Sequence, residues 1–352
     1  MVNTSTIVAL LRQQIPGFSP DQAGSRFGDL GIDSFGLLEL LATIERATGA
    51  PMSDTAWGEI ETPAQLMAYL QRDVVAPSSE HGPTLRRRYA LNMPQMAVGG
   101  LSESWLFKEL GDAHWSMITA GLDAPSSALC DDQGDRLYAA LTRIRIESSA
   151  PLRAFEENEN VALDARISRY GRSMFFSEVA LHGTQKTLKA SLMSSFAKRG
   201  APTTNTSLVK SQPNIPAGCP IPDLAMLPDF GLGYRLQRGN ALPPALFETT
   251  YDIVPYHDIN GVGLLYFAAY PTINDICELA FMERNQRWAF DSSTLSRDIF
   301  YFANADAQDR LLYRVHAKRP IAGGVAIESS LSRLSDGALM AYLVTHKAVP
   351  HA

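Results

Sequence analysis

Apolar residues in the first 75 positions recur every three or four residues, which is the spacing of a helix with one buried face. Leu37, Leu38, Leu41 and Ile44 share such a face, and Pro63 opens another helical segment in the first turn, where proline is tolerated. The pattern predicts a small helical bundle, with helices over residues 3–14, 35–48 and 64–72.

From residue 85 onward, apolar and polar positions alternate over most of the chain, which is typical of strands with one face in a core. Two long segments, residues 102–119 and 264–284, keep helical spacing instead. The predicted strands cover residues 137–146, 165–170, 174–182 and 188–198 in the first half of this region, and 299–302, 311–317, 325–331 and 338–347 in the second.

The two halves of this region repeat each other. Ten residues separate Tyr89 from Gly99 and Tyr251 from Gly261, and each glycine leads toward the long helix of its half. The strand after each helix lies 49 residues beyond that tyrosine. One helix wrapped by an antiparallel sheet is the hot-dog arrangement, so the repeat predicts an α+β double hot-dog. Another α+β fold with a single helix and four or more strands is the alternative.

Composition marks the boundaries of these regions. Residues 76–84 are rich in Pro, Ser and Gly, and residues 200–246 hold eight of the 21 prolines of the chain. The chain is predicted to begin with a helical domain (residues 1–75) and a linker (76–84). The first half of the repeat (85–199), an irregular connection (200–246) and the second half (247–352) follow.

Charge and cysteine usage exclude several classes of protein. Residues 1–75 carry nine acidic and four basic residues within a chain of net charge −6, so nucleic acid is not an expected partner. No apolar run approaches the roughly 20 residues that a membrane-spanning helix needs. The three cysteines form no close pair, and the histidines show no metal-binding spacing. We expect a soluble, cytoplasmic protein without a metal site or membrane contact.

Ser34 lies at the start of the helix predicted over residues 35–48, where unpaired backbone N–H groups and the helix dipole favour a negative group. A phosphodiester on its hydroxyl would be stabilised there, although Asp33 or Ser34 can also serve as an ordinary N-cap. The run Leu30-Gly31-Ile32-Asp33-Ser34-Phe35, within a small acidic domain, resembles the acyl carrier proteins.

This resemblance covers residues 1–75 and implies a four-helix carrier bundle. It implies 4′-phosphopantetheine on Ser34, attached by a phosphopantetheinyl transferase, with the acyl chain on its thiol. Phe35 departs from the usual Leu but remains large and apolar. Glu39 and Glu45 are candidates for docking basic partner enzymes, and a solvated helix face explains them equally well.

The second half resembles hot-dog thioester enzymes in a loop, Asp258-Ile259-Asn260-Gly261-Val262-Gly263, that is followed by Tyr266. The whole region from residue 85 to 352 also resembles the acyltransferase/decarboxylases typified by the leinamycin-pathway enzyme. The segments that carry this likeness are residues 93–96, 100–106, 111–115 and 258–267.

That second resemblance implies an enzyme of polyketide biosynthesis that decarboxylates methylmalonyl-CoA and delivers propionyl to a carrier, with polyketide synthase components as partners. Here the carrier is fused, which holds the acceptor thiol at an effective concentration on the order of millimolar for a short linker.

Decarboxylation of a malonyl-type thioester leaves negative charge on the thioester oxygen, which backbone N–H groups at a helix N-terminus can stabilise. Two glycine-led segments are therefore the expected substrate-binding sites: Gly99, Gly100, Leu101 and Ser102 in the first half, and Gly261, Val262 and Gly263 in the second. Ser102 is also a candidate cap of the first helix.

The family resemblance also implies a central tyrosine. Tyr138, in the strand after the first helix, is the first candidate and Tyr266 is the second. Asn260 is expected to hydrogen-bond a thioester oxygen or carboxylate, and Asp258 is either chemical or structural. His114 is the last candidate, although a lone helix histidine is more often structural.

Two other functions fit the same residues. A hot-dog thioesterase or dehydratase acting on a carrier-bound chain would use Asp258 and His257 for acid–base chemistry. A non-enzymatic protein would only hold the carrier-bound chain. The sequence leaves open the identity of the acyl group, the oligomeric state and whether the carrier is loaded within its own chain.

Overall fold

The computed structural model describes residues 8–12, 15, 17–32, 36–37, 39–40, 43–44, 60–70, 82–201, 204–234, 237, 240–282 and 286–349. The chain divides into two compact units. The first comprises residues 1–81, 169–172 and 222–239, and the second comprises residues 82–168, 173–221 and 240–352.

The first unit has a short apolar core under its helices. Leu11, Leu40, Ile44 and Leu66 are fully buried. Helix α4 (Pro63–Leu70) matches the helix predicted over residues 64–72, and a 3₁₀ turn covers Pro20–Gln22. Residues 8–12 and the described positions between 36 and 44 are helical. The four-helix bundle as a whole is not shown by these residues and stays a prediction.

The second unit is built on one antiparallel sheet of 11 strands. Its first half contains β1 (Thr84–Ala90), β4 (Tyr138–Ser148), β5 (Asn160–Tyr170), β6 (Met174–Gly183), β7 (Lys186–Arg199) and the short β8 (Leu208–Lys210). Its second half contains β9 (Phe247–Asp252), β10 (Ser293–Tyr301), β11 (Arg310–Ile321), β12 (Gly324–Arg333) and β13 (Leu339–Ala348).

The two halves share one strand order. The sheet runs β1-β5-β6-β7-β4 and continues β10-β13-β12-β11-β9, so each half places its first strand at an edge and its second at the centre. Strands β4 and β10 join the halves, with Ile144 paired to Ile299. Ion pairs of Asp298 with Arg143 (2.6 Å) and Arg145 (2.8 Å) reinforce this junction. The internal repeat in the sequence therefore corresponds to a repeat in topology.

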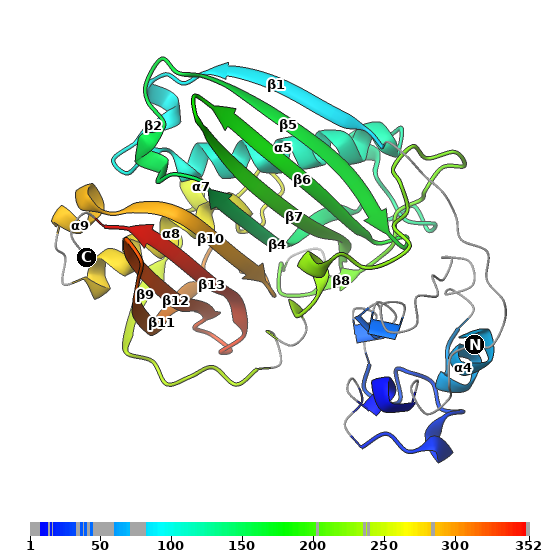
Figure 1. Cartoon of the computed structure of the whole chain (residues 1–352). Coiled ribbons are helices and arrows are strands. Elements are labelled where there is room, and N and C mark those ends of the chain that lie inside the picture. Colours follow the sequence, from blue (N-terminus) through cyan, green and yellow to red (C-terminus); the bar gives the residue numbers. More distant parts are fainter. Residues whose placement is uncertain are drawn as a thin grey trace. The chain divides into compact units, whose positions relative to one another are not determined.

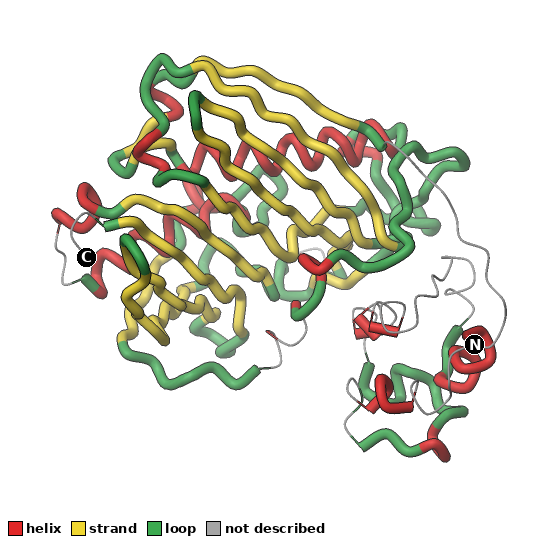
Figure 2. Tube along the Cα trace, in the orientation of Figure 1, coloured by secondary structure: helices red, strands yellow, loops and turns green. Residues whose placement is uncertain are grey.

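Each half carries one long helix. Figure 1 shows α5 (Glu103–Gly121) crossing the first half of the sheet and α8 (Tyr270–Phe281) accompanying the second, and Figure 2 shows these helices behind the strand layer. Shorter elements are the hairpin of β2 (Met96–Ala97) and β3 (Gly100–Leu101), α7 (Pro255–Asp258), α9 (Gln286–Asp291) and the 3₁₀ turns Met93–Gln95, Ser126–Ala128, Leu152–Ala154, Asp229–Gly231 and Phe267–Ala269.

Helix α5 agrees with the prediction over residues 102–119. Ser102 is its N-cap and accepts a hydrogen bond from the Trp105 N–H (3.3 Å). Leu106, Phe107 and Leu110 are fully buried at helical spacing and form part of the core. Burial of three such side chains contributes on the order of 2 kcal/mol each to folding.

The predicted start of the second helix is wrong. The chain from Leu264 to Tyr266 is not helical, and α8 begins at Tyr270 with Pro271 in its first turn. The Leu265 N–H donates to the Asn304 side chain (2.9 Å) and the Tyr266 N–H to the Asp258 carbonyl (2.7 Å). These long-range partners hold the segment extended although its apolar spacing suits a helix.

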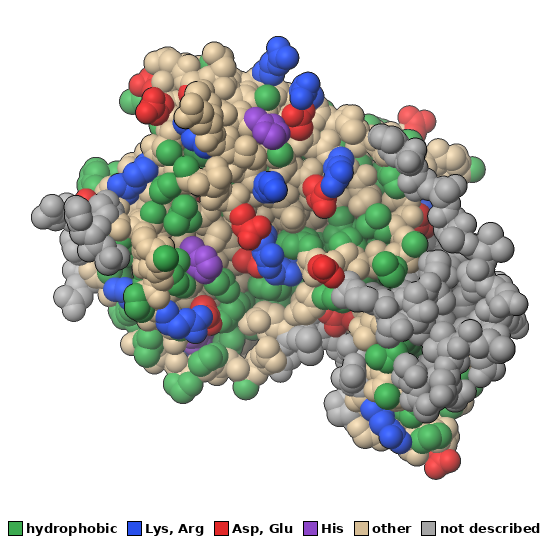
Figure 3. Space-filling view, viewed as in Figure 1, with side chains coloured by type: hydrophobic (Ala, Val, Ile, Leu, Met, Phe, Trp, Pro, Cys, Tyr) green, Lys and Arg blue, Asp and Glu red, His purple; other side chains and the backbone are tan. Residues whose placement is uncertain are grey.

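The visible face of the sheet carries mixed charge. In Figure 3, acidic and basic side chains lie close together on this face. Ion pairs between strands of the sheet include Arg166–Glu178 and Arg86–Asp164. Interspersed charges of both signs differ from the basic stripe of a nucleic-acid-binding surface.

Candidate functional site

Two pockets of the second unit contain most of the candidate residues. The first, here called the Tyr138 pocket, has a volume of about 280 Å³ and lies where the middle of α5 meets the start of β4 and the loop before α8. It is lined by Gly111, Asp112, His114, Trp115, Ser126, Arg136, Tyr138, Ala139, Leu141, Asn260, Val262, Leu264, Tyr266 and Phe267.

The second, here called the Glu103 pocket, has a volume of about 320 Å³ and lies where the N-terminus of α5 meets the middle of α8 and the start of β10. It is lined by Ala97, Val98, Gly99, Leu101, Ser102, Glu103, Ser104, Leu152, Thr272, Asp275, Ile276, Leu279, Trp288, Ser292, Ser293, Thr294 and Lys347. The pockets thus use corresponding parts of the two halves.

The Tyr138 pocket brings together both candidate tyrosines. Tyr138 is the first residue of β4, and Tyr266 follows the loop that contains Asn260. Among the described residues, neither hydroxyl has a hydrogen-bond partner. Burial, followed by the negative charges of Asp112 and Glu109, raises the pKa of Tyr266. The Tyr266 hydroxyl therefore keeps its proton at neutral pH and is available as a donor.

Two arginines lie beside Tyr138. The guanidinium carbon of Arg136 is 5.2 Å from the ring centroid, and that of Arg199 is 5.8 Å away. Within the described part of the chain, neither arginine forms an ion pair with a carboxylate. Arg199 donates to the Asn205 side chain (3.2 Å) and to the Val262 carbonyl, while its buried Nε has no partner there. The pocket therefore has a positive character around the tyrosine.

Asn260 is held by its side-chain oxygen. This oxygen accepts hydrogen bonds from the Val262 N–H (3.1 Å) and the Leu264 N–H (3.0 Å), which fixes the direction of the amide. The amide nitrogen makes no hydrogen bond with another described residue, and Asn260 lines the pocket. Asn260 can therefore donate to a ligand, as its predicted role requires.

Asp258 does not line this pocket. It is fully buried and accepts hydrogen bonds from the Tyr251 hydroxyl (2.9 Å) and the Val254 N–H (2.8 Å), and it contacts His257 Nδ1 (2.7 Å). Burial and the bond to Asp258 raise the pKa of Tyr251. These contacts favour the structural alternative for Asp258, in which it anchors the loop that presents Asn260.

His114 lines the Tyr138 pocket without a free ring nitrogen. Nδ1 is 2.6 Å from the Ser177 hydroxyl and Nε2 is 2.8 Å from the Ser194 hydroxyl. Burial lowers the pKa of His114 to about 3, so the ring is neutral at physiological pH. The geometry supports the structural interpretation of this histidine.

The glycine-led segment of the first half is divided by the fold. Gly99, Leu101 and Ser102 line the Glu103 pocket, but Gly100 does not. Gly100 has a φ of +109°, and a Cβ there would lie 2.2 Å from the Arg153 Cα. Gly100 was predicted to let the backbone approach a ligand, but in the fold it lets the backbone approach the segment that contains Arg153.

The segment Gly261–Gly263 is a turn rather than a helix tip. The Val262 N–H donates to the Asn260 side chain and the Gly263 N–H to the Asn260 carbonyl (2.9 Å), and α8 begins seven residues after Gly263. Only Val262 of the three lines the Tyr138 pocket. The Val262 and Gly263 N–H groups, two of the expected oxyanion donors, are thus occupied, and the side chains of Asn260, Tyr138 and Tyr266 offer donors in the pocket.

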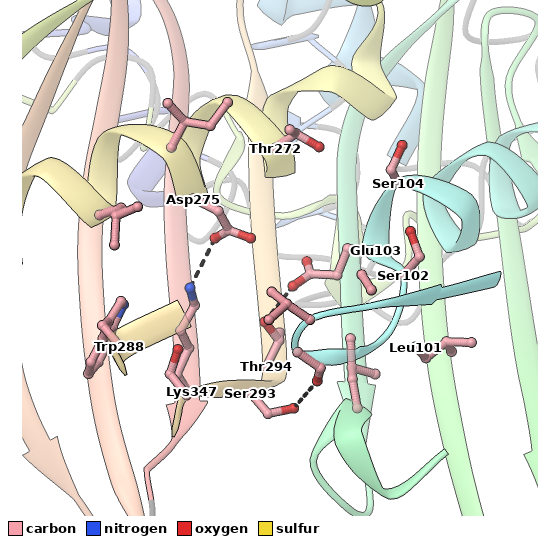
Figure 4. A pocket seen from close by; sticks show the side chains of 17 residues that line it. Leu101, Ser102, Glu103, Ser104, Thr272, Asp275, Trp288, Ser293, Thr294 and Lys347 are labelled. Atoms are coloured by element: carbon pink, nitrogen blue, oxygen red, sulfur yellow. Dashed lines mark hydrogen bonds and ion pairs between the residues drawn. The ribbon is translucent and has the colours of Figure 1, made fainter. Parts of the chain in front are cut away.

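The charges of the Glu103 pocket compensate one another. Arg297 is fully buried and binds Glu103 (2.6 Å) and Asp275 (2.8 Å), while Lys347 binds Asp275 (3.0 Å) and Glu278 (2.7 Å). Figure 4 shows Asp275 and Lys347 pointing toward each other. The two cations lower the pKa of Asp275, so it stays ionised. Two cations against three carboxylates leave no positive charge for an anionic ligand.

The sequence analysis did not single out Arg136 or Asp112. Arg136 lies two residues before Tyr138, and residues two apart in an extended chain share a face, so this spacing was the available signal for Arg136. Asp112 pairs with Arg87 (2.6 Å) at the rim of the pocket. The pairing of α5 with the distant loop, which brings Asp112 near Asn260, has no local sequence signal.

Ser34 lies outside the described residues. The described turn before it is ordered by hydrogen bonds from the Ile32 N–H to the Phe27 carbonyl (3.0 Å) and from the Gly31 N–H to the Gly28 carbonyl (3.1 Å). A Cβ at Gly28 or Gly31 would meet no atom of a described residue within 4 Å.

Two findings concern metals and membranes. The described residues contain no cluster of three or more His, Cys, Asp or Glu side chains arranged to hold a metal ion. None of the described helices combines the length and apolar character needed to cross a membrane.

Residues 5–70 match the family model described as "Phosphopantetheine attachment site". This segment is therefore a carrier domain, with covalently attached 4′-phosphopantetheine as its cofactor. None of the curated protein sequences compared with the chain matches it.

Several solved thioesterases are similar in structure to the chain. A candidate oleoyl thioesterase from Lactobacillus plantarum (12% identity, TM-score 0.56) matches over 77% of this chain and 98% of its own. The 12:0-ACP thioesterase from Umbellularia californica (11%, 0.53) matches over 76% and 94%. An acyl-ACP thioesterase from Bacteroides thetaiotaomicron (13%, 0.51) matches over 75% and 97%. At these identities the likeness shows the hot-dog fold alone.

Proposed function

We propose that the second unit is a decarboxylating acyltransferase of polyketide biosynthesis. It takes a malonyl-type acyl-CoA, with methylmalonyl-CoA as the expected substrate, and loads a short acyl group on the carrier domain at Ser34. Its two halves are two hot-dog copies in one chain, a proposal supported by their shared strand order. Phosphopantetheinyl transferase and polyketide synthase components are the corresponding partners.

The observation that supports this most strongly is the composition of the Tyr138 pocket. Two tyrosine hydroxyls without partners among the described residues lie in a pocket with an arginine that no carboxylate neutralises there. Cleavage of the bond between the α-carbon and the carboxylate releases carbon dioxide and leaves the electron pair as an enolate, with its charge on the thioester oxygen. Neutral hydroxyl donors stabilise such an oxygen, while the positive charge of the arginine attracts an anionic acyl group.

The residues of the pocket have separable tasks. Tyr138, Tyr266 and the amide nitrogen of Asn260 donate hydrogen bonds to the thioester oxygen, and each donor is worth about 3–4 kcal/mol if it resembles other oxyanion donors. Trp115 and Phe267 form apolar walls that exclude water from the enolate. The enolate takes up one proton at its α-carbon, which gives the propionyl thioester. The pantetheine thiol of the carrier then accepts the propionyl group in exchange for the thiol of CoA.

A thioesterase is the second candidate, and the fold of the second unit favours it because the similar solved structures are thioesterases. It needs a base that activates water in the pocket. Asp258 and His257, the residues expected for this task, do not line the Tyr138 pocket, whereas the Asp112 carboxylate does. The Asp112 carboxylate forms an ion pair with Arg87 at 2.6 Å, a contact that it would have to share with the attacking water.

The two functions differ in their products. The full-length holo protein is mixed with methylmalonyl-CoA, and both the intact protein mass and the released carbon dioxide are measured. The proposed function predicts a propionyl adduct on the protein together with carbon dioxide. Free methylmalonate without carbon dioxide supports the thioesterase and contradicts the proposal. The Ser34→Ala variant is the matched control, because it should lose the adduct while free CoA thioester is still decarboxylated.

A further inference from the structure

We propose that Arg136 recognises the α-carboxylate of the acyl group, so that the Tyr138 pocket selects carboxylated over simple acyl thioesters. This inference rests on the proposed function and names the residue that determines its substrate class. It begins from the surroundings of Arg136.

Arg136 lines the pocket from its rim. The side chain is exposed, and its guanidinium lies over the Tyr138 ring at 5.2 Å from the centroid. Within the described ranges it has neither an ion pair nor a side-chain hydrogen bond. A stacking contact with an aromatic ring orients the guanidinium plane while leaving its N–H donors available.

The other charges of the pocket do not neutralise Arg136. Asp112, the acidic side chain that lines the pocket, is paired with Arg87 at 2.6 Å. Arg199 adds a second positive charge at 5.8 Å from the Tyr138 ring, and its contacts are with the neutral Asn205 side chain and the Val262 carbonyl. An anion is thus favoured beside Tyr138.

The Glu103 pocket lacks this property. Its cation Lys347 contacts Asp275 and Glu278, and Arg297 behind it contacts Glu103 and Asp275. An anionic acyl group gains no free cation there. The two pockets, which occupy corresponding places in the two halves, therefore differ in the sign of the charge that they favour.

A guanidinium suits a carboxylate because its planar N–H groups can donate two parallel hydrogen bonds to the two oxygens. This ion pair is present in the bound substrate and is lost when carbon dioxide leaves. Arg136 therefore stabilises the ground state at least as much as the transition state, so its loss should raise KM and leave kcat unchanged or slightly higher.

An anion at this position can come from the acyl carboxylate or from the phosphates of CoA, and two ligands separate these sources. Methylmalonyl-N-acetylcysteamine thioester has the carboxylate and no phosphate, whereas propionyl-CoA has phosphates and no carboxylate. The experiment measures KM and kcat for decarboxylation of the first and the Kd of both, in the full-length parent and in Arg136→Gln. Arg88→Gln, at an exposed arginine of β1 outside the Tyr138 pocket, is the matched control.

For Arg136→Gln we expect KM and Kd of the carboxylated thioester to rise about tenfold, as for a lost charge-assisted hydrogen bond. We expect kcat within about twofold of the parent and an unchanged Kd for propionyl-CoA. Unchanged binding of the carboxylated thioester overturns the inference, as does weakened binding of propionyl-CoA alone. A fall in kcat without a change in KM overturns it too.

Failure of the proposed function is distinct from failure of this inference. A parent protein that releases no carbon dioxide from any carboxylated thioester contradicts the decarboxylase, and the two Kd values still test Arg136. An active parent with an Arg136→Gln variant of identical KM and Kd contradicts the role of Arg136 alone.

Discussion

Substitution of Asp258 by Ala tests whether this carboxylate is structural. Asp258 is fully buried and accepts hydrogen bonds from the Tyr251 hydroxyl at 2.9 Å and the Val254 N–H at 2.8 Å. Both donors bind the same oxygen, Oδ2, and alanine removes this shared acceptor. Because each donor then stays unpaired in a partly buried site, the loop loses the stabilisation of two charge-assisted hydrogen bonds.

The size of the effect follows from these two donors. A hydrogen bond to a charged group contributes about 1.5–3 kcal/mol, so the loss should be about 3–6 kcal/mol for the pair. Asp258→Asn retains an oxygen for the same donors and should lose only about 1 kcal/mol. We expect the amides of residues 251–266 to exchange about two to four orders of magnitude faster in Asp258→Ala, on the order of the lost free energy.

Hydrogen exchange followed by mass spectrometry measures this directly in the full-length protein. Tyr251→Phe is a further control, since it removes one of the donors and leaves the carboxylate in place. If Asp258→Ala exchanges at the parent rate and yet has no turnover, Asp258 acts in the chemistry and our structural assignment of it is wrong.

Three further tests concern the tyrosines, His114 and Gly100. Tyr138→Phe and Tyr266→Phe should each lower kcat for carbon dioxide release on the order of a hundredfold, because each removes a donor to the enolate oxygen. The substrate Kd should change little. If both variants retain the parent kcat, these hydroxyls are not the donors. The pKa of about 3 for His114 in the folded protein lies below the value near 6.5 in the unfolded chain. The contribution of neutral His114 to the free energy of unfolding is therefore complete above about pH 6.5 and decreases as the pH falls toward 3. In urea denaturation the parent should therefore lose about 2 kcal/mol more than His114→Gln between pH 7 and pH 5, and equal pH profiles would show that His114 is not buried and neutral. Gly100→Ala should lower the melting temperature strongly, because the new Cβ would lie 2.2 Å from the Arg153 backbone and the residue has a φ of +109°. Gly99→Ala should not, because its nearest contact would be at 3.8 Å. Equal melting temperatures of the two variants would refute the close approach at Gly100.

The sequence predicts the repeat and α5 because both depend on local patterns. The same apolar spacing misplaces the start of the second helix, since Leu265 and Tyr266 are held extended by Asn304 and by the Asp258 backbone. No periodicity reports such distant partners. Pro271 lies in the first turn of α8, a position that proline tolerates, so it indicated the true start of this helix better than the apolar spacing did.

The fold brings three of the predicted site residues into one pocket, and their roles in the chemistry stay predictions. Tyr138, Tyr266 and Asn260 share one pocket, as a site requires. Asp258 and His114 have residue types suited to chemistry, but their polar atoms are bound by Tyr251, Ser177 and other neighbours. Burial of a polar side chain depends on the pairing of distant segments, so residue type alone does not separate a chemical from a structural role.

The most direct test of the central claim is a structure of the full-length protein with a methylmalonyl-CoA analogue whose α-carboxylate is replaced by a sulfonate, which cannot leave as carbon dioxide. Our account predicts the thioester oxygen within hydrogen-bond distance of the Tyr138 or Tyr266 hydroxyl, and the sulfonate beside Arg136. An acyl group bound in the Glu103 pocket, or outside both pockets, would contradict it.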